Sequence, residues 1–454
     1  MPTLSTSNKT SGRDFMSTDR KPNILWIFSD QHRAHALGCY GDDNIQTPNL
    51  DRLATEGMRF TRAYANTPLC APSRATLYTG KYATSHGVVS LHIPLLPGHR
   101  TLPEVLREYG YHTSHMGKWH LSGGAAPCAF VSPFFRPGWN DWCGWENSNR
   151  PWETQYTTGD NPRPLKTLPG YQTDALTDLT VEWIRNQPAD RPWFHVVSLE
   201  PPHPPHTAPE KYEAMFRDKP LKLRPNVPET HPNRDRFIAD LRRYYAQIAN
   251  LDDNVGRIVE ALEQTGQLDD TIIFYFSDHG ELMGSHGMTG KGRPEEESVN
   301  IPLIIRYPKR VPRGKVSHAY ISMVDMMPTL LGMIGADIPE GVEGADLSDT
   351  VFGRREEGAD AVLLQHEHTF FTPTPKSAFR SILTNDWSYT CFLVEGPSQL
   401  FNLHEDPYQM RNLIREPGFA EVREELHAKL AAKLKELGDD FLQRANAFSS
   451  LSKE

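Results

Sequence analysis

Two apolar runs of the sequence each end in a Ser-Asp pair. The first is PNILWIFSD, residues 22–30, and the second is TIIFYFSDHG, residues 271–280. Such runs are typical of buried strands in a parallel sheet, whose carboxyl ends meet at one edge. We therefore expect Asp30 and Asp278 to share that edge, with Gln31 and His279 beside them. Carboxylates and an imidazole suit a divalent cation, although aspartates in this position also cap the helices that follow.

Cationic and imidazole side chains follow other strand-like segments. Lys118 and His120 are separated by one residue, so in an extended segment both point to the same side. His203 lies in PPHPPH, where prolines restrict the backbone, and Lys291 lies in the Gly-rich GMTGKGRPEEE. Together they predict a site for an anionic ligand. Each also has a simpler interpretation, as a surface lysine, a hydrogen-bonded histidine or a loop residue.

A solitary cysteine lies in NTPLCAPSRATLYTG, residues 66–80. Most solitary cysteines are small buried hydrophobic residues, and residue types alone leave this interpretation of Cys70 open. The string CAPSR, however, resembles the C-x-P-S-R core of the type I sulfatases, and Thr79-Gly80 stands where that motif has its T-G. SDQ, CAPSR, GKWH, PPHPP, SDHG and GK follow in the family's order. The resemblance extends from about Pro22 to LFNLHEDPYQMRNL, residues 400–413.

The resemblance implies hydrolysis of sulfate monoesters by a cysteine that is modified after translation. In this family the cysteine, here Cys70, is oxidised to formylglycine, so a formylglycine-generating enzyme or an anaerobic maturase is an expected partner. One hydroxyl of the hydrated aldehyde attacks sulfur, and the other drives collapse to the aldehyde and expels sulfate. An ordinary thiol would instead be trapped as a stable adduct.

The resemblance also implies a metal site. Asp30, Asp278 and His279 would bind the metal with the modified Cys70, and Gln31 stands where many members have a second aspartate. The family often has Asn in place of His279, although several branches use His. These two departures lower the negative charge around the metal, so we expect Ca²⁺, while Mg²⁺ and Mn²⁺ stay open.

The remaining catalytic roles follow from the same resemblance. Arg74 would hold the diol and metal region, and Lys118 and Lys291 would bind sulfate oxygens. His120 would assist the hydroxyls of formylglycine, and His203 would be the general acid for the leaving oxygen.

The substrate is predicted from an aromatic segment, RPGWNDWCGWENSNRPWETQY, residues 136–156. Flat aromatic faces suit stacking on sugars or aryl groups, so we expect Trp142 and Trp145 to bind a sulfated carbohydrate, with a small aryl sulfate as the alternative. His92, His206 and Arg380 are further candidates for the pocket wall. Aromatic clusters also anchor loops, and that interpretation stays open.

Two other functions compete with this interpretation. Relatives with similar DQ and DH motifs cleave phosphodiesters or phosphonate monoesters within the same alkaline-phosphatase-like superfamily. A protein of another class, one that binds a metal and an anion without turnover, would result if Cys70 stays unmodified.

Apolar strands that alternate with helices predict an α/β fold. We expect a large, mostly parallel sheet flanked by helices, and a small C-terminal antiparallel sheet packed with one helix. The predicted division is a disordered tail at 1–20, a catalytic domain at 21–358 and a C-terminal α+β subdomain at 359–454. The segment 47–64, TPNLDRLATEGMRFTRAY, is predicted to be a helix.

Composition excludes several classes of protein. The net charge of −9 and the lack of a basic stripe argue against a nucleic-acid partner. Five irregularly spaced cysteines form neither a C-x-x-C metal arrangement nor a disulfide framework. No apolar leader or membrane-spanning run is visible, so we expect a cytoplasmic protein that is not in a membrane.

Overall fold

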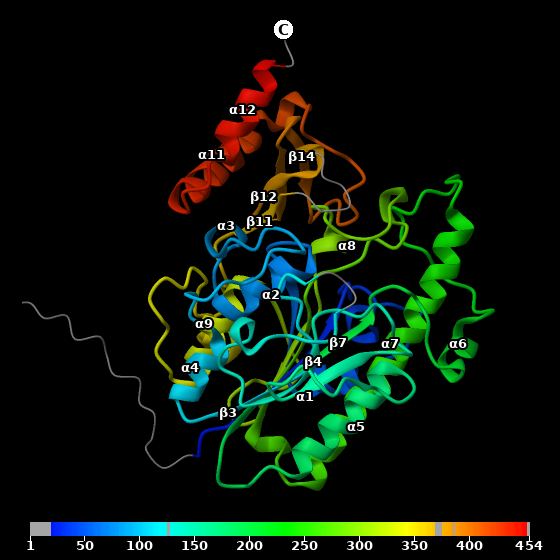
Figure 1. Ribbon diagram of the computed structural model, residues 1–454. Coiled ribbons are helices and arrows are strands. Elements are labelled where there is room, and N and C mark those ends of the chain that lie inside the picture. Colours follow the sequence, from blue (N-terminus) through cyan, green and yellow to red (C-terminus); the bar gives the residue numbers. More distant parts are fainter. Residues whose placement is uncertain (1–19, 125–127, 368–374, 385, 452–454) are drawn as a thin grey trace, which may run out of the picture.

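The computed structural model describes residues 20–124, 128–367, 375–384 and 386–451 (Figure 1). The predicted tail, residues 1–20, lies outside this part of the chain except for Arg20. None of the helices in these ranges is long and apolar enough to cross a membrane.

A ten-stranded mixed sheet forms the centre of the molecule, in the order β10-β2-β9-β8-β1-β7-β3-β4-β5-β6. The strands are β1 (Asn23–Asp30), β2 (Met58–Tyr64), β3 (His112–Lys118), β4 (Asp141–Trp145), β5 (Gln155–Thr158), β6 (Lys166–Thr167), β7 (Trp193–Pro202), β8 (Thr271–Ser277), β9 (Leu303–Arg306) and β10 (Lys315–Ser322). The central strand β1 is parallel to both β7 and β8, whereas β9 is antiparallel to its neighbours. The predicted large sheet is thus confirmed, with its parallel strands at the centre.

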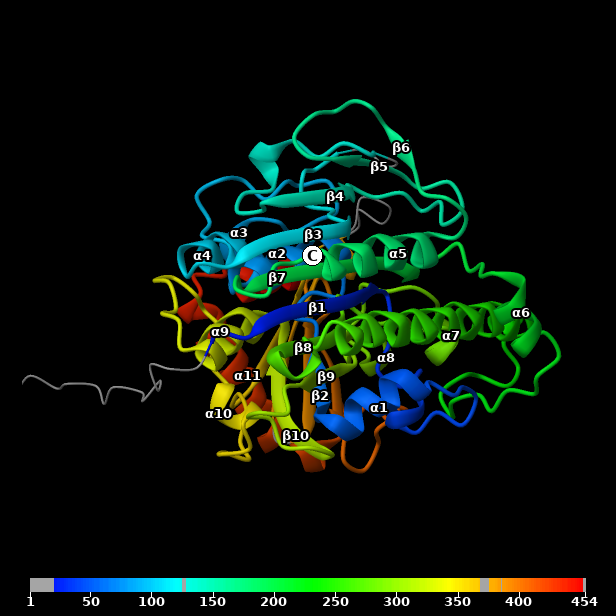
Figure 2. The same ribbon diagram turned by 90° about the horizontal axis from the view of Figure 1, so that it is seen from below.

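Helices cover both faces of this sheet (Figure 2). One face packs against α1 (Pro48–Glu56), α5 (Gln172–Arg185), α6 (Glu210–Phe216) and α7 (Arg234–Gln264). The other packs against α2 (Cys70–Thr79), α4 (Leu102–Glu108), α9 (Met323–Ile334) and α10 (Ser348–Val351). Two short helices, α3 (Ala83–His86) and α8 (Glu296–Val299), complete this part.

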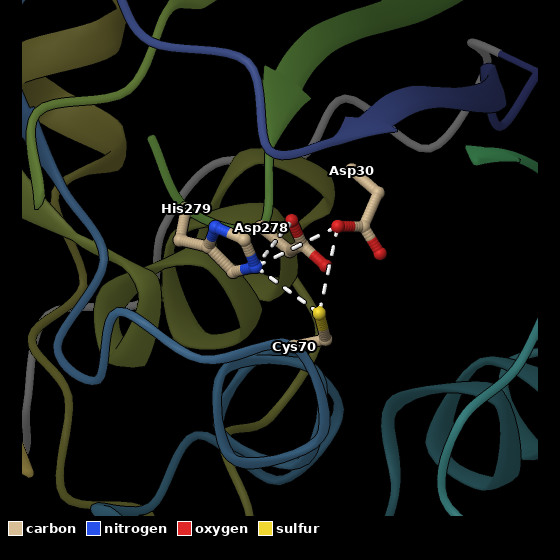
Figure 3. A group of neighbouring side chains, drawn as sticks. All are labelled: Asp30, Cys70, Asp278 and His279. Atoms are coloured by element: carbon tan, nitrogen blue, oxygen red, sulfur yellow. Dashed lines mark hydrogen bonds and ion pairs between the residues drawn. The ribbon is translucent and has the colours of Figure 1, made fainter. Parts of the chain in front are cut away.

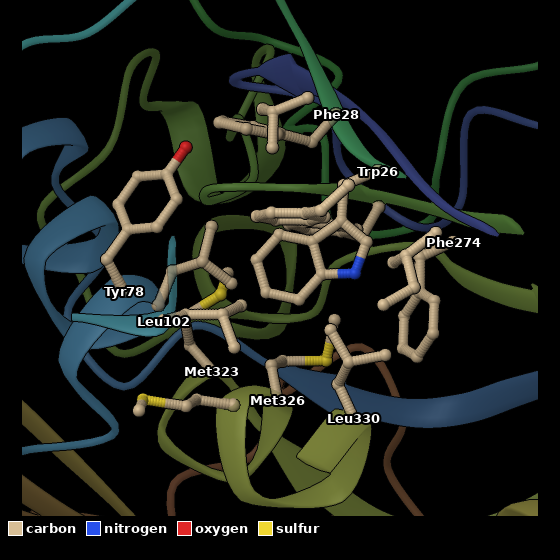
Figure 4. Packing of buried hydrophobic residues seen from close by; sticks show 14 of the residues in the cluster. Trp26, Phe28, Tyr78, Leu102, Phe274, Met323, Met326 and Leu330 are labelled. Carbon is tan, nitrogen blue, oxygen red and sulfur yellow. The ribbon is translucent and has the colours of Figure 1, made fainter. Parts of the chain in front are cut away.

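The alternation of side chains along β1 divides the core in two. Trp26 and Phe28 point to the face of α2 and α9, where Met323 and Leu330 pack against them (Figure 4). Leu25 and Ile27 point to the opposite face. All eight residues of β1 are buried, which is why the sequence of this strand is apolar on both faces.

A four-stranded antiparallel sheet follows near the C-terminus, in the order β11-β12-β13-β14. Its strands are β11 (Val362–His366), β12 (Phe379–Thr384), β13 (Trp387–Phe392) and β14 (Gly396–Asn402). Two helices, α11 (Ala420–Glu436) and α12 (Phe441–Leu451), pack with it, whereas one was predicted. The predicted small sheet is confirmed, and the domain boundaries stay a prediction.

The helix predicted for residues 47–64 is wrong in its second half. Helix α1 ends before Gly57, and residues 58–64 form β2 between β9 and β10. A Cβ atom on residue 57 would lie 2.3 Å from the carbonyl oxygen of Ile305. Glycine therefore allows α1 to end directly against β9, and the chain reverses into the sheet.

Candidate active site

The ends of β1 and β8 bring two aspartates together. The strands pair in register up to Ser29 and Ser277, so Asp30 and Asp278 leave the sheet side by side. Gln31, whose φ of 68° lies in the left-handed region, turns the chain and donates its backbone N–H to Asp278 Oδ1 at 3.1 Å. Both carboxylates are fully buried.

Helix α2 adds a thiol to this pair, because Cys70 is its first residue. Its Sγ lies 3.1 Å from His279 Nε2 and 3.5 Å from Asp30 Oδ1 (Figure 3). One ligand atom from each of Asp30, Cys70, Asp278 and His279 lies within 4.8 Å of the others. His279 Nδ1 lies 3.0 Å from the carbonyl oxygen of Gly280, which leaves Nε2 free to act as a ligand. This donor set fits a divalent cation.

Arg74, one helical turn after Cys70, holds the two aspartates from the side of α2. Its Nε donates to Asp278 Oδ2 at 2.9 Å and its Nη2 to Asp30 Oδ2 at 3.1 Å. Its Nη1 donates to the Lys118 carbonyl oxygen and to Ser198 Oγ, both at 2.9 Å. The fully buried guanidinium thus orients both carboxylates and joins β1, β3, β7 and β8.

Two lysines converge on the same carboxylate from different segments. Lys118 Nζ lies 2.8 Å from Asp30 Oδ2, and Lys291 Nζ lies 3.0 Å from Cys70 Sγ and 2.6 Å from Gln31 Oε1. Although burial favours protonation, the two ammonium groups hold the pKa of Asp30 well below its usual range. Burial and Asp30 oppose ionisation of Cys70, but Lys291 and Lys118 lower the net pKa of its thiol.

Two histidines lie at the edge of this charge cluster. His120 has a φ of 62°, and its buried Nδ1 has no hydrogen-bond partner among the described residues. Burial and Lys118 lower its pKa well below the usual range. His203 Nδ1 lies 2.6 Å from the Pro204 carbonyl oxygen, and burial and Lys291 lower the pKa of its imidazole. Both rings are therefore neutral near pH 7.

Two predicted pocket residues lie further out. His206 Nδ1 lies 2.9 Å from Gln247 Oε1, and its ring contacts Tyr244, whose hydroxyl donates to the Gln31 carbonyl oxygen. His206 thus reaches the cluster indirectly, through Tyr244 and through Gln247, whose amide also donates to the His203 carbonyl oxygen at 3.5 Å. His92 is half-buried in the loop before α4, and its backbone faces Gly123.

For three residues that were predicted to bind substrate, the structure corrects the prediction. Trp142 and Trp145 belong to β4, not to a loop, and are buried in the core. The ring of Trp142 stacks on His115 and also contacts Arg136, while Trp145 Nε1 donates to Glu200 at 3.4 Å. Neither tryptophan offers a face to a sugar.

Arg380 is the third of these residues, and its predicted place in the pocket wall is wrong. It is fully buried in the C-terminal sheet, where Asp439 and Glu367 pair with its guanidinium. Its charge is therefore neutralised within that part of the molecule, and it is not a wall of the site.

Residues that the sequence reasoning missed support the cluster from behind. Glu200, near the end of β7, lies 3.4 Å from Lys118 Nζ and accepts backbone N–H groups from Ser148 and Asn149. Glu281 accepts the side-chain amide of Gln31. Glu200 carried the same signal as Asp30, an acidic residue at the end of an apolar strand, and was overlooked beside the histidines that follow it.

Two family models match this sequence and together cover most of its length. A family model described as sulfatase matches residues 22–336, and one described as the C-terminal part of N-sulphoglucosamine sulphohydrolase matches residues 284–436. The chain belongs to the sulfatase family. This sulfatase is therefore a sulfuric ester hydrolase, and the reaction class expected from the CAPSR motif is confirmed.

Individual relatives agree with this assignment. An ulvan-active sulfatase of Formosa agariphila is 35% identical to this sulfatase over 446 residues, which cover 97% of this chain and 86% of the relative. The crystal structure of the candidate sulfatase YidJ from Bacteroides fragilis is 28% identical with a TM-score of 0.85 and covers 96% of this chain and 100% of its own.

A third relative has a different activity. The structure of the phosphonate monoester hydrolase of Agrobacterium radiobacter is 27% identical with a TM-score of 0.75, covering 93% of this chain and 97% of that one. The predicted alkaline-phosphatase-like architecture is thus confirmed.

Proposed function

We propose that this sulfatase removes sulfate from sulfated carbohydrates and that the formylglycine form of Cys70 is its nucleophile. The observation that carries the proposal is the position of Cys70 Sγ. It lies among the ligand atoms of Asp30, Asp278 and His279 and within 3.0 Å of Lys291 Nζ. A nucleophile at this place has metal ligands on one side and a cation for the sulfate group on the other.

We assign the metal to Asp30, Asp278, His279 and the modified Cys70. A divalent cation bound there supplies positive charge that stabilises an ionised hydroxyl and the sulfate oxygens. Oxygen ligands favour Ca²⁺, and Mg²⁺ or Mn²⁺ fits the same donors. Gln31 Oε1 already accepts from Lys291, so Gln31 is proposed both to orient that lysine and to face the metal.

The remaining residues divide the work of binding and proton transfer. Lys118 and Lys291 bind the sulfate oxygens, Arg74 fixes the carboxylates, and the unpartnered Nδ1 of His120 leaves that ring able to bond a formylglycine hydroxyl. His203 protonates the leaving oxygen. Since its pKa is lowered by burial and by Lys291, this role requires the negative charge of the bound ester to raise the pKa again.

The carbohydrate assignment rests on the relatives and no longer on the aromatic segment. The sulfatase of Formosa agariphila, which aligns with 97% of this chain, is active on ulvan. A small aryl sulfate stays the alternative substrate. The expected maturation enzyme and the cytoplasmic location also stay predictions.

The second candidate is a hydrolase that cleaves phosphodiesters or phosphonate monoesters. It is favoured by the likeness to the Agrobacterium radiobacter enzyme and by Asp30-Gln31 and Asp278-His279, which resemble the DQ and DH motifs of relatives that cleave phosphodiesters. The PSR triplet after Cys70 favours sulfate.

Mass spectrometry of the tryptic peptide AYANTPLCAPSR, residues 63–74, tests the nucleophile directly. We expect an aldehyde at Cys70 in protein produced with a maturase, together with one bound divalent cation and faster turnover of nitrophenyl sulfate than of bis-nitrophenyl phosphate. Faster phosphodiester cleavage would favour the second candidate. A persistent thiol with a bound metal and no turnover would favour the binding protein.

A further inference from the structure

A cavity of about 280 Å³ lies on the α7 side of the sheet, between the loop after β1 and the loop after α6. These loops, blue and green in Figure 2, contact each other, since Asn44 Nδ2 donates to the Lys222 carbonyl oxygen at 3.0 Å. Charged and aromatic residues line the cavity: Arg33, His35, Asp42, Lys222, Arg224 and Tyr245. Its volume is several times the ~30 Å³ that one water molecule occupies.

The guanidinium of Arg33 has almost no partners in this cavity wall. The residue is 2% exposed, and its Nη1 donates to the Leu282 carbonyl oxygen at 3.4 Å. Among the described residues this guanidinium has no other hydrogen bond and no ion pair, and its buried Nε has no acceptor. An arginine carries five N–H donors, and buried donors without acceptors are costly.

The nearby carboxylates act on Arg33 through space but form no ion pair with it within the described residues. Although burial opposes the charged form, Tyr245, Tyr244, Asp42 and Glu297 raise the pKa of Arg33. Asp42 accepts from the Tyr245 hydroxyl at 2.6 Å and from the Asn44 backbone N–H at 2.9 Å. The exposed side chain of Lys222 lies at the rim, 3.5 Å from Asp43, and Arg224 Nε donates to Glu297 at 2.8 Å. Lys222 at the rim and Arg224 in the wall thus each pair with a carboxylate, whereas Arg33, which is more deeply buried, does not.

A neutral histidine adds a second unpartnered group. The buried Nδ1 of His35 has no hydrogen-bond partner among the described residues. Burial and the neighbouring Arg224 lower the pKa of His35 to about 3, so its ring is uncharged near pH 7. A neutral imidazole can donate one hydrogen bond to an anion.

We propose that this cavity is a second anion site, in which Arg33 binds a small oxyanion, either sulfate or a carboxylate. Lys118 and Lys291 lie against Asp30 and Cys70, whereas Arg33 lines this cavity, so the two sites use different cations. A cation is disfavoured, although Asp42 and Asp43 line the cavity, because it would lie against Arg33, Lys222 and Arg224 in the same lining.

The site lies directly behind the candidate active site. The Arg33 backbone N–H donates to the Tyr244 hydroxyl at 3.0 Å, and that hydroxyl donates to the Gln31 carbonyl oxygen at 2.8 Å. An anion on Arg33 therefore stiffens the segment that positions Gln31.

Equilibrium dialysis of the full chain against radiolabelled inorganic sulfate tests the proposal. We expect Arg33→Met to bind one sulfate fewer per chain than the unsubstituted protein, or to bind that sulfate at least about tenfold more weakly. An equal number of sulfate ions with equal affinity would overturn the proposal. Acetate as a competitor distinguishes the two sources, because displacement of the Arg33-dependent sulfate by acetate indicates a carboxylate site.

A second variant keeps the test decisive if Arg33→Met does not fold. Lys222 is exposed at the rim, so we expect Lys222→Gln to leave the fold unchanged. The substitution should lower the affinity for the same sulfate ion roughly threefold, because it removes a partly screened charge. Binding that is insensitive to Lys222→Gln in folded, active protein would count against the site.

Discussion

Two buried arginines of this sulfatase, Arg74 and Arg380, look alike by burial and by charge. Each is fully buried and pairs with two carboxylates, Arg74 with Asp30 and Asp278, and Arg380 with Glu367 and Asp439. One lies at the centre of the candidate active site, and the other lies inside the small C-terminal sheet.

The difference lies in what else surrounds the carboxylates. Around Asp30 and Asp278 stand two lysines, an imidazole and a thiol, which are more cations and ligands than a structural ion pair needs. Around Asp439 the remaining partners are ordinary, namely the Gln365 amide and the Phe441 backbone N–H. A buried charge pair therefore indicates a functional site only where cations and metal-type ligands converge on the same oxygens.

Asp30→Asn is the strongest way to test this contrast. It removes a metal ligand and the counter-charge of Lys118, so we expect kcat/KM for nitrophenyl sulfate to fall about 10⁴-fold and the bound metal to be lost. The matched control is Asp439→Asn, which breaks the other network and should lower Tm without changing kcat. Activity and metal content that survive Asp30→Asn would contradict the assignment.

Arg380→Met breaks the C-terminal network and leaves Glu367 and Asp439 without their main partner. We expect the free energy of unfolding to fall by about 3–5 kcal/mol, as for other broken buried ion pairs. Urea denaturation measures this loss, and the folded fraction should keep its kcat. A loss of kcat in fully folded protein would contradict this structural role and support the predicted place of Arg380 in the active site.

Lys291→Met removes the cation beside Cys70 while the carboxylates stay paired with Arg74. Loss of one preorganised contact to the sulfate oxygens should lower kcat/KM about a hundredfold. Stability should fall by about 1–3 kcal/mol, because the Lys291 side chain is only 15% exposed and Gln31 Oε1 loses its donor. Lys429→Met, on the exposed face of α11, is the control that should leave kinetics unchanged.

Trp142→Phe tests the corrected role of the aromatic segment. The substitution weakens the stack on His115 and the contact with Arg136, which should cost about 1 kcal/mol of stability. KM for a sulfated saccharide should stay unchanged, because the ring does not face solvent. A clear rise in KM with an unchanged Tm would restore the predicted stacking role.

The sequence predicted the position of Asp30 and Asp278 well because both follow apolar strands that pair in register. The parallel centre of a sheet needs such strands, and their ends meet by geometry alone. Cys70 gave no such signal, since a thiol at the start of a helix looks the same whether it is structural or modified. It was assigned through the CAPSR resemblance.

The errors have a common physical origin in long-range packing. Trp142 stacks on His115 from the preceding strand of the sheet, and Arg380 pairs with Asp439, 59 residues later, so their burial left no local pattern. The strand after α1 was missed because its apolar residues continue the spacing of the helix, although Gly57 marked the boundary. His206 and His92 were candidates by residue type alone, and the contacts of His206 are with Gln247 and Tyr244.

The central position of β1 also affects how the protein is made. Trp193 and Ser277, in the two strands that flank β1, lie 170 and 248 residues after their partners Asn23 and Ser29. During synthesis an eight-residue apolar strand therefore waits for its first neighbour until β7 has been translated, and for its second until β8 has followed. Exposed strands of this kind associate between chains. We therefore expect a holdase chaperone that covers β1 to raise the yield of native protein.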